Sequence, residues 1–310
     1  MNKNLFARLR PLIGLLVLSI AISWFSPRFL TTGNILNVLR QTSINAVIAT
    51  GMTFVILTGG IDLSVGSVLA YTGAVMAALL GTGLPLGASC FVVLALGAAI
   101  GCVTGVIITK GKAQPFIATF VSMTLLRGAT LVFTDGRPID AGQGLHADAF
   151  AFLGQGYFLS IPLPVFFMAA VLGLGYYILG HTRLGRYVFA LGSNENAARL
   201  SGLRTDLVKT TVYAISGVLA ALAGIILTSR LSSAQPTAGQ GYELDAIAAV
   251  VIGGTTLSGG RGSLLGTIIG ALVIGILNNG LNLMNVSSYY QMLAKGAVIL
   301  VAVLLDRRSE

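Results

Sequence analysis

Long apolar runs separated by short polar segments make up most of the chain. A helix that crosses a bilayer needs roughly 20 apolar residues, and the runs are continuous rather than alternating, so they predict membrane-spanning helices and not a barrel. We expect about ten spans. They cover approximately residues 11–25, 41–58, 64–81, 88–109, 116–134, 161–180, 210–229, 244–257, 264–284 and 289–305.

Composition supports an all-α integral membrane protein. The 310 residues are 55% hydrophobic and 9% charged, whereas a soluble domain carries roughly 25% charged residues. The spans leave no room for a second unit, so we expect residues 1–310 to form a single transmembrane domain. Two sets of glycines at spacings of four predict stripes of close helix packing. They are Gly97, Gly101 and Gly105, and Gly262, Gly266 and Gly270.

The distribution of cations predicts the orientation. Residues 181–209 are the longest polar interruption and are strongly basic, so this loop stays in the cytoplasm. With ten spans, both termini lie on that side. The cytoplasmic segments then hold 13 of the 19 Lys and Arg residues and the outer loops hold 3. Residues 135–160 become an acidic outer loop, with Asp135, Asp140 and Asp148.

Within the basic loop, residues 195–203 have a helix-forming composition, and Gly202 is of the kind that ends helices. A short helix on this face could contact a soluble partner. The alternative is a solvated loop that only sets the topology.

Charged residues in or beside spans are costly and are therefore candidates for a transport pathway. Asp62 precedes the third span, where it could equally cap a helix. Glu243 and Asp245 open the eighth span, where the helix dipole also favours anions. Arg127 could pair with one of these acids or line a water-filled path, and Lys295 needs a partner.

Three asparagines, Asn278, Asn279 and Asn282, gather near the outer end of the ninth span. Neutral hydrogen-bonding groups of this kind suit a neutral, hydroxyl-rich solute better than an ion. The alternative is a hydrated helix end.

No catalytic or nucleotide-binding motif is present. The chain has no phosphate-binding loop, no dinucleotide fingerprint and no Cys/His cluster for a metal. The net charge of +9 lies in loops between spans and does not indicate nucleic acid. We therefore expect a non-enzymatic chain that binds no cofactor or metal, so any ATP that powers transport must be hydrolysed by another chain.

Four long segments resemble sugar-transporting permeases of the ATP-binding-cassette class, most closely those of ribose-type importers. These segments are residues 41–67, 181–209, 229–263 and 277–292, and the resemblance covers nearly the whole chain. It implies a multi-pass protein of the cell inner membrane, embedded in lipid. It also implies three protein partners: a second permease copy, a cassette ATPase that uses ATP and Mg, and a periplasmic sugar-binding protein.

The resemblance further implies that the helix in the basic loop couples the permease to the ATPase. The residues concerned are Asn194, Glu195, Asn196, Ala197, Ala198, Arg199, Leu200, Ser201 and Gly202. The sugar itself stays open, since related permeases carry several sugars.

A second hypothesis is a stand-alone transporter of a small neutral solute, driven by protons or sodium. It would need an ionisable group deep in a span, and Arg127 and Lys295 are its only candidates.

Overall fold

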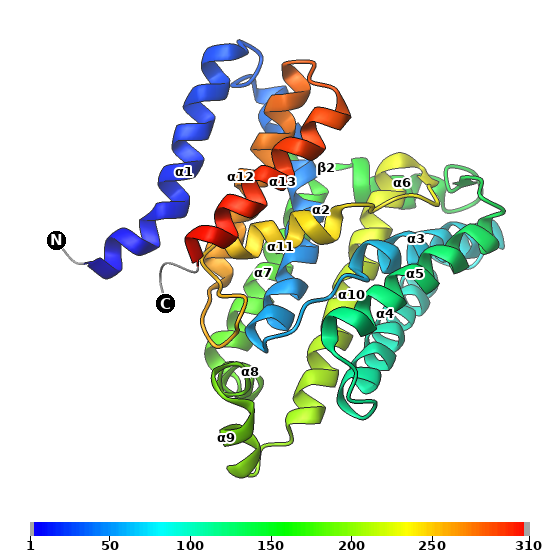
Figure 1. Ribbon diagram of the computed structural model, residues 1–310. Coiled ribbons are helices and arrows are strands. Elements are labelled where there is room, and N and C mark those ends of the chain that lie inside the picture. The colour runs from blue at the N-terminus through cyan, green and yellow to red at the C-terminus, as the bar shows by residue number, and fades with distance from the viewer. Residues whose placement is uncertain (1–2, 307–310) are drawn as a thin grey trace.

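The computed structural model describes residues 3–306, and helices account for most of them (Figure 1). The helices are α1 (Lys3–Phe25), α2 (Thr32–Leu57), α3 (Val65–Gly81), α4 (Leu86–Thr109), α5 (Pro115–Thr134), α6 (Ala147–Gln155), α7 (Leu163–His181), α8 (Arg183–Ser193), α9 (Glu195–Leu200), α10 (Thr205–Leu231), α11 (Tyr242–Ile252), α12 (Leu264–Leu283) and α13 (Ser288–Asp306). The strands are β1 (Ile139–Asp140), β2 (Tyr157–Phe158), β3 (Ile161–Pro162) and β4 (Ser233–Ala234). Arg307 and Arg308, which the predicted orientation counts as cytoplasmic, lie outside the described residues.

An all-α membrane protein is confirmed. In the described part of the chain, five helices are long and apolar enough to cross a bilayer, namely α4, α5, α7, α10 and α12. Each of the ten predicted spans coincides with a helix to within about five residues, except at three places. The helices of the first two spans begin earlier than predicted, α1 by eight residues at Lys3 and α2 by nine residues at Thr32. The span predicted at 244–257 is the shorter helix α11, whose 11 residues extend only about 16 Å.

The centre of the bundle is α10, which packs against α2, α3 and α4. Glycines make these contacts close. A Cβ added at Gly101 would overlap the backbone carbonyl of Tyr213, and one added at Gly97 would lie within 2.6 Å of Ala221. Gly270 is packed in the same way against Ala249 of α11. The first predicted glycine stripe is therefore a helix contact, where small residues let backbones approach. In the second stripe this holds for Gly266 and Gly270, whereas Gly262 lies in the loop before α12, against the Thr255 side chain.

The 135–160 segment contains a helix that we did not predict. The N–H of Gly154 in α6 donates to Ser229 Oγ of α10 at 2.7 Å, and the Gln155 amide donates to the carbonyls of Ser229 and Arg230 at 3.2 Å. β1 also pairs with β4 in an antiparallel register that sets Ile139 opposite Ala234. With nine residues, α6 is too short for a clear periodic pattern, and its position depends on these distant partners.

Figure 1 places α6 at one end of the bundle and α8 and α9 at the other. The acidic and basic loops of the sequence therefore lie at opposite ends.

The close contact at Gly101 gives a test of the packing. Gly101→Leu should lower the melting temperature in detergent, because overpacking a well-packed site costs about 1–3 kcal/mol. Gly173→Leu is the matched control, since an added Cβ there meets nothing within 4 Å. Equal melting temperatures for the two variants would contradict the close α4–α10 contact.

Candidate functional site

The basic loop folds into two helices, and the first was not predicted. α8 begins after Thr182, whose hydroxyl accepts the N–H of Gly185 at 3.3 Å, the usual way of capping a helix start. Leu184, Val188 and Leu191 face the bundle at helical spacing, the last two fully buried. This amphipathic spacing was visible in the sequence and could have predicted the helix.

The second helix, α9, is the one predicted. Asn194 caps it by accepting the N–H of Ala197 at 2.9 Å. It ends at Leu200, three residues earlier than expected, and Gly202 follows with a φ of +82°. The N–H of Leu203 closes the end on the carbonyl of Ala198 at 3.1 Å. Local sequence determines both ends of this helix.

Ion pairs connect α9 to the start of α10. Glu195 pairs with Lys209 at 2.6 Å, and Arg199 lies 3.4 Å from Glu195 and 3.3 Å from Asp206. The Lys209 side chain is only 17% exposed, whereas that of Arg199 is 59% exposed. Exposed pairs contribute little to stability, so the Arg199 pairs mainly orient the helix.

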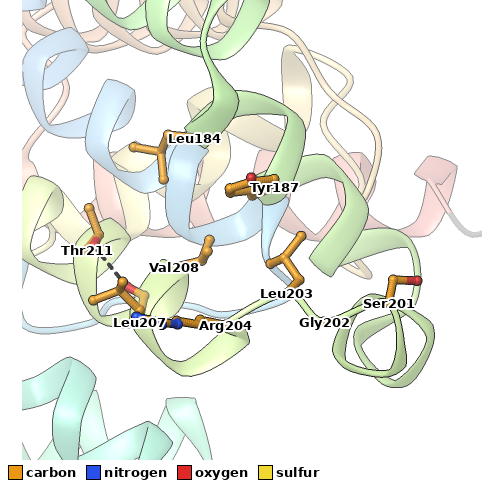
Figure 2. A pocket seen from close by; sticks show the side chains of 9 residues that line it. All are labelled: Leu184, Tyr187, Ser201, Gly202, Leu203, Arg204, Leu207, Val208 and Thr211. Carbon is orange, nitrogen blue, oxygen red and sulfur yellow. Dashed lines mark hydrogen bonds between the residues drawn. The ribbon is translucent and has the colours of Figure 1, made fainter.

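The solvent-exposed surface of α8, α9 and the start of α10 is partly apolar. Leu200 is 89% exposed at the tip of α9 and Leu207 is 59% exposed on α10. An open groove of about 490 Å³ lies between α8 and the start of α10, with Leu184 and Tyr187 on one side and Leu207 and Val208 on the other (Figure 2). The exposed Leu200 of α9, together with the neighbouring groove, offers an apolar surface that a protein partner could bind.

Backbone contacts connect α8 to the membrane helices. A Cβ added at Gly192 would overlap the carbonyl oxygen of Leu57, the last residue of α2. The N–H of Gly260 donates to that same carbonyl at 3.0 Å, and Gly260 also lies against Ser193. A displacement of α8 therefore acts directly on the end of α2 and on the turn that precedes α12.

Asp62 is fully buried beside α10. Its Oδ1 accepts the Ser64 N–H at 3.0 Å and the Ser64 hydroxyl at 2.6 Å, and its Oδ2 accepts the Ser216 hydroxyl at 2.7 Å. The carboxylate thus holds the residues just before α3 and joins them to α10.

The other charged candidates bind either backbone groups or each other. Arg127 does not form an ion pair with the acids. Its Nη1 donates to the carbonyls of Pro236 at 2.7 Å and Ala238 at 2.9 Å. Lys295 pairs with buried Asp245 at 3.0 Å, and Glu243 accepts the N–H of Gly241 at 3.3 Å.

The three asparagines do not act as one cluster. The side chain of Asn279 exchanges two hydrogen bonds with that of Asn34, at 2.9 and 3.0 Å. Asn282 accepts from the Gln291 amide at 2.8 Å. The Oδ1 of Asn278 is buried without a partner in the described part of the chain.

Residues 3–306 contain no group of three or more His, Cys, Asp or Glu side chains placed to hold a metal ion.

Known proteins resemble this chain over nearly its whole length. A family model described as "Branched-chain amino acid transport system / permease component" matches residues 34–303. The "Ribose import permease protein RbsC" of Haemophilus influenzae is 59% identical, over 96% of this chain and 92% of that protein. The protein of the same name from Bacillus subtilis is 54% identical, over 97% and 93%.

A "Probable ABC transporter permease protein" of Escherichia coli is 39% identical, over 95% of this chain and 89% of that protein. No solved structure matches.

Removing the α9 cap should loosen this helix. Asn194→Ala should raise amide hydrogen exchange in residues 195–200, because the loss of a cap costs about 1 kcal/mol. Asn196→Ala is the matched control, since Asn196 is exposed and lies within the helix. Unchanged exchange in Asn194→Ala would mean that tertiary contacts alone hold the helix.

Proposed function

This chain belongs to the permease family described as the branched-chain amino acid transport system permease component, and we propose that it is the transmembrane permease subunit of an ATP-driven ribose importer. The main support for this proposal is the 59% identity, over 96% of the chain, to a ribose import permease. The family description names an amino acid system, but a family model covers many substrates. Close identity to proteins named for ribose favours the sugar.

As the permease of an inner-membrane importer, the chain would have three protein partners. A cassette ATPase binds the end formed by α8 and α9, and it alone uses ATP and Mg. A periplasmic sugar-binding protein delivers the sugar at the opposite end, where α6 lies. A second permease copy completes the path. The cation asymmetry of 13 to 3 supports this orientation.

We count ten crossings in a single transmembrane domain. The helices α1, α2, α3, α4, α5, α7, α10, α12 and α13 supply nine, and residues 232–252, which include α11, supply the tenth. Both termini then lie in the cytoplasm with α8 and α9.

ATP-driven closure of the ATPase would move the coupling helix α9. Its ion pairs with α10 and the contact of Gly192 with Leu57 give that movement two routes into the membrane helices. The exposed Leu200 suits insertion into an apolar depression of the ATPase.

Ion-driven transport has less support. Lys295 pairs with Asp245, and Arg127 is bound to backbone carbonyls, so neither is a free ionisable group.

The importer assignment is tested by reconstituting the chain with its candidate ATPase in proteoliposomes. Ribose-loaded binding protein should stimulate ATP hydrolysis, and uptake should persist when the membrane potential is collapsed. The absence of a complex, together with uptake that follows an ion gradient, would reject the importer.

Reversing one charge on α9 should uncouple the two subunits. Arg199→Glu places a third acid beside Glu195 and Asp206, which repels them and displaces α9. We expect loss of ribose uptake and of stimulated ATP hydrolysis, with normal membrane insertion. Arg28→Glu makes the same charge change at an exposed position in the turn between α1 and α2, away from α8 and α9, and should transport normally. Unchanged uptake by Arg199→Glu would reject the coupling role.

A further inference from the structure

The helix α3 begins at mid-depth of the bundle. It runs parallel to α10, with Leu69 against Gly224 and Gly73 against Thr228. Just before α3, Asp62 bonds to Ser216. Since α10 covers Thr205–Leu231, the first turn of α3 lies beside the middle of α10.

The helix α11 begins at the same depth from the opposite side. Residues 232–241 descend from the outer end of α10, and Gly239 makes backbone contact with Gly66 in the first turn of α3. The next residues start α11, which lies across the middle of the molecule in Figure 1. The N-terminal ends of two helices thus meet near the middle of the membrane, an arrangement that transporters use around their substrate paths.

Arg127 of α5 holds the descending loop through the carbonyls of Pro236 and Ala238. In the described residues its hydrogen bonds come from Nη1 alone, which leaves Nε and Nη2 for other partners. Glu243, in the first turn of α11, attracts it electrostatically. Both side chains are only partly buried.

The surface around this pair is exposed. Thr237 and Gln240 of the loop are exposed, and Leu244 of α11 is 50% exposed. A partly exposed Arg and Glu at mid-depth would be costly against lipid, so such residues face a water-filled cavity or another protein chain. The face that carries Arg127 and Glu243 is therefore one that lipid does not cover.

We infer that the sugar crosses the membrane along the face formed by α5, residues 232–241 and the first turn of α11, where Arg127 and Glu243 bind its hydroxyl groups. This inference rests on the proposed import function, in which a second permease copy closes the other side of the path. It names the lining residues, which the proposed function leaves open.

The chemistry of the pair fits a neutral polyol. A guanidinium donates and a carboxylate accepts, so together they satisfy both the oxygen and the hydrogen of neighbouring hydroxyl groups. Their opposite charges offset each other and give the path little preference for ions. Gln240 adds a neutral amide, and Ser67 in the first turn of α3 has a buried hydroxyl with no partner among the described residues.

The test measures solvent access in the assembled importer in proteoliposomes. Cys90 and Cys102 are first replaced by alanine, and Leu244→Cys is then added. A membrane-impermeant, positively charged methanethiosulfonate reagent probes the thiol. The matched control restores the natural Cys102, which is exposed on α4 and would face lipid.

We expect Leu244→Cys to react at least about 10-fold faster than Cys102, because a charged reagent does not enter hydrocarbon. Its modification should also block ribose uptake, whereas treatment of the Cys102 protein should not. Equal reaction rates, or full uptake after complete modification of Leu244→Cys, would overturn the inferred path.

The outcomes separate this inference from the importer assignment. Normal ribose uptake with an unreactive Leu244→Cys rejects the path alone. If the chain forms no ATPase complex but Leu244→Cys still reacts quickly in proteoliposomes that hold the permease alone, the importer is rejected and the water-exposed face is retained.

Discussion

The structure depends on the requirement that backbone polar groups be paired where water is absent. Helices meet it along most of the chain. Irregular segments 58–64 and 232–241 reach the middle of the bundle, and both are held by side chains. Asp62 binds Ser64 and Ser216 at the first, and Arg127 binds two carbonyls of the second. Asp62 and Arg127 thus form hydrogen bonds with backbone groups that lie outside the helices.

Close glycine packing makes the bundle suited to transmitting movement. Where Gly192 lies against Leu57 and Gly260 against Ser193, no flexible side chain lies between the backbones to absorb a displacement. At α9, in contrast, the exposed Arg199 forms ion pairs with Glu195 and Asp206, and such pairs can rearrange when a partner binds. A rigid interior with an adaptable surface is consistent with a subunit that is driven from outside the membrane.

Much of the architecture was predictable. Apolar runs located the membrane helices because most of them are long enough to span a bilayer, and Gly202 marked the end of α9 because capping is a local interaction. The Asn194 cap at the start of α9 is equally local but was not predicted. Two helices, α8 and α6, were not predicted. α8 carried an amphipathic pattern inside a loop that composition alone classed as polar. α6 lacked a usable signal, since its place depends on Ser229, about 75 residues away.

The sequence by itself determined the membrane class, the approximate positions of the membrane helices and the short helix α9, since each follows from local composition or spacing. Only the tertiary structure decided the partners of the costly charges. Lys295 pairs with Asp245, whereas Arg127 donates to backbone carbonyls instead of pairing with an acid. The three neighbouring asparagines lie in three different environments. Such pairings join residues far apart in the chain, and no local pattern encodes which distant group will lie within hydrogen-bonding distance.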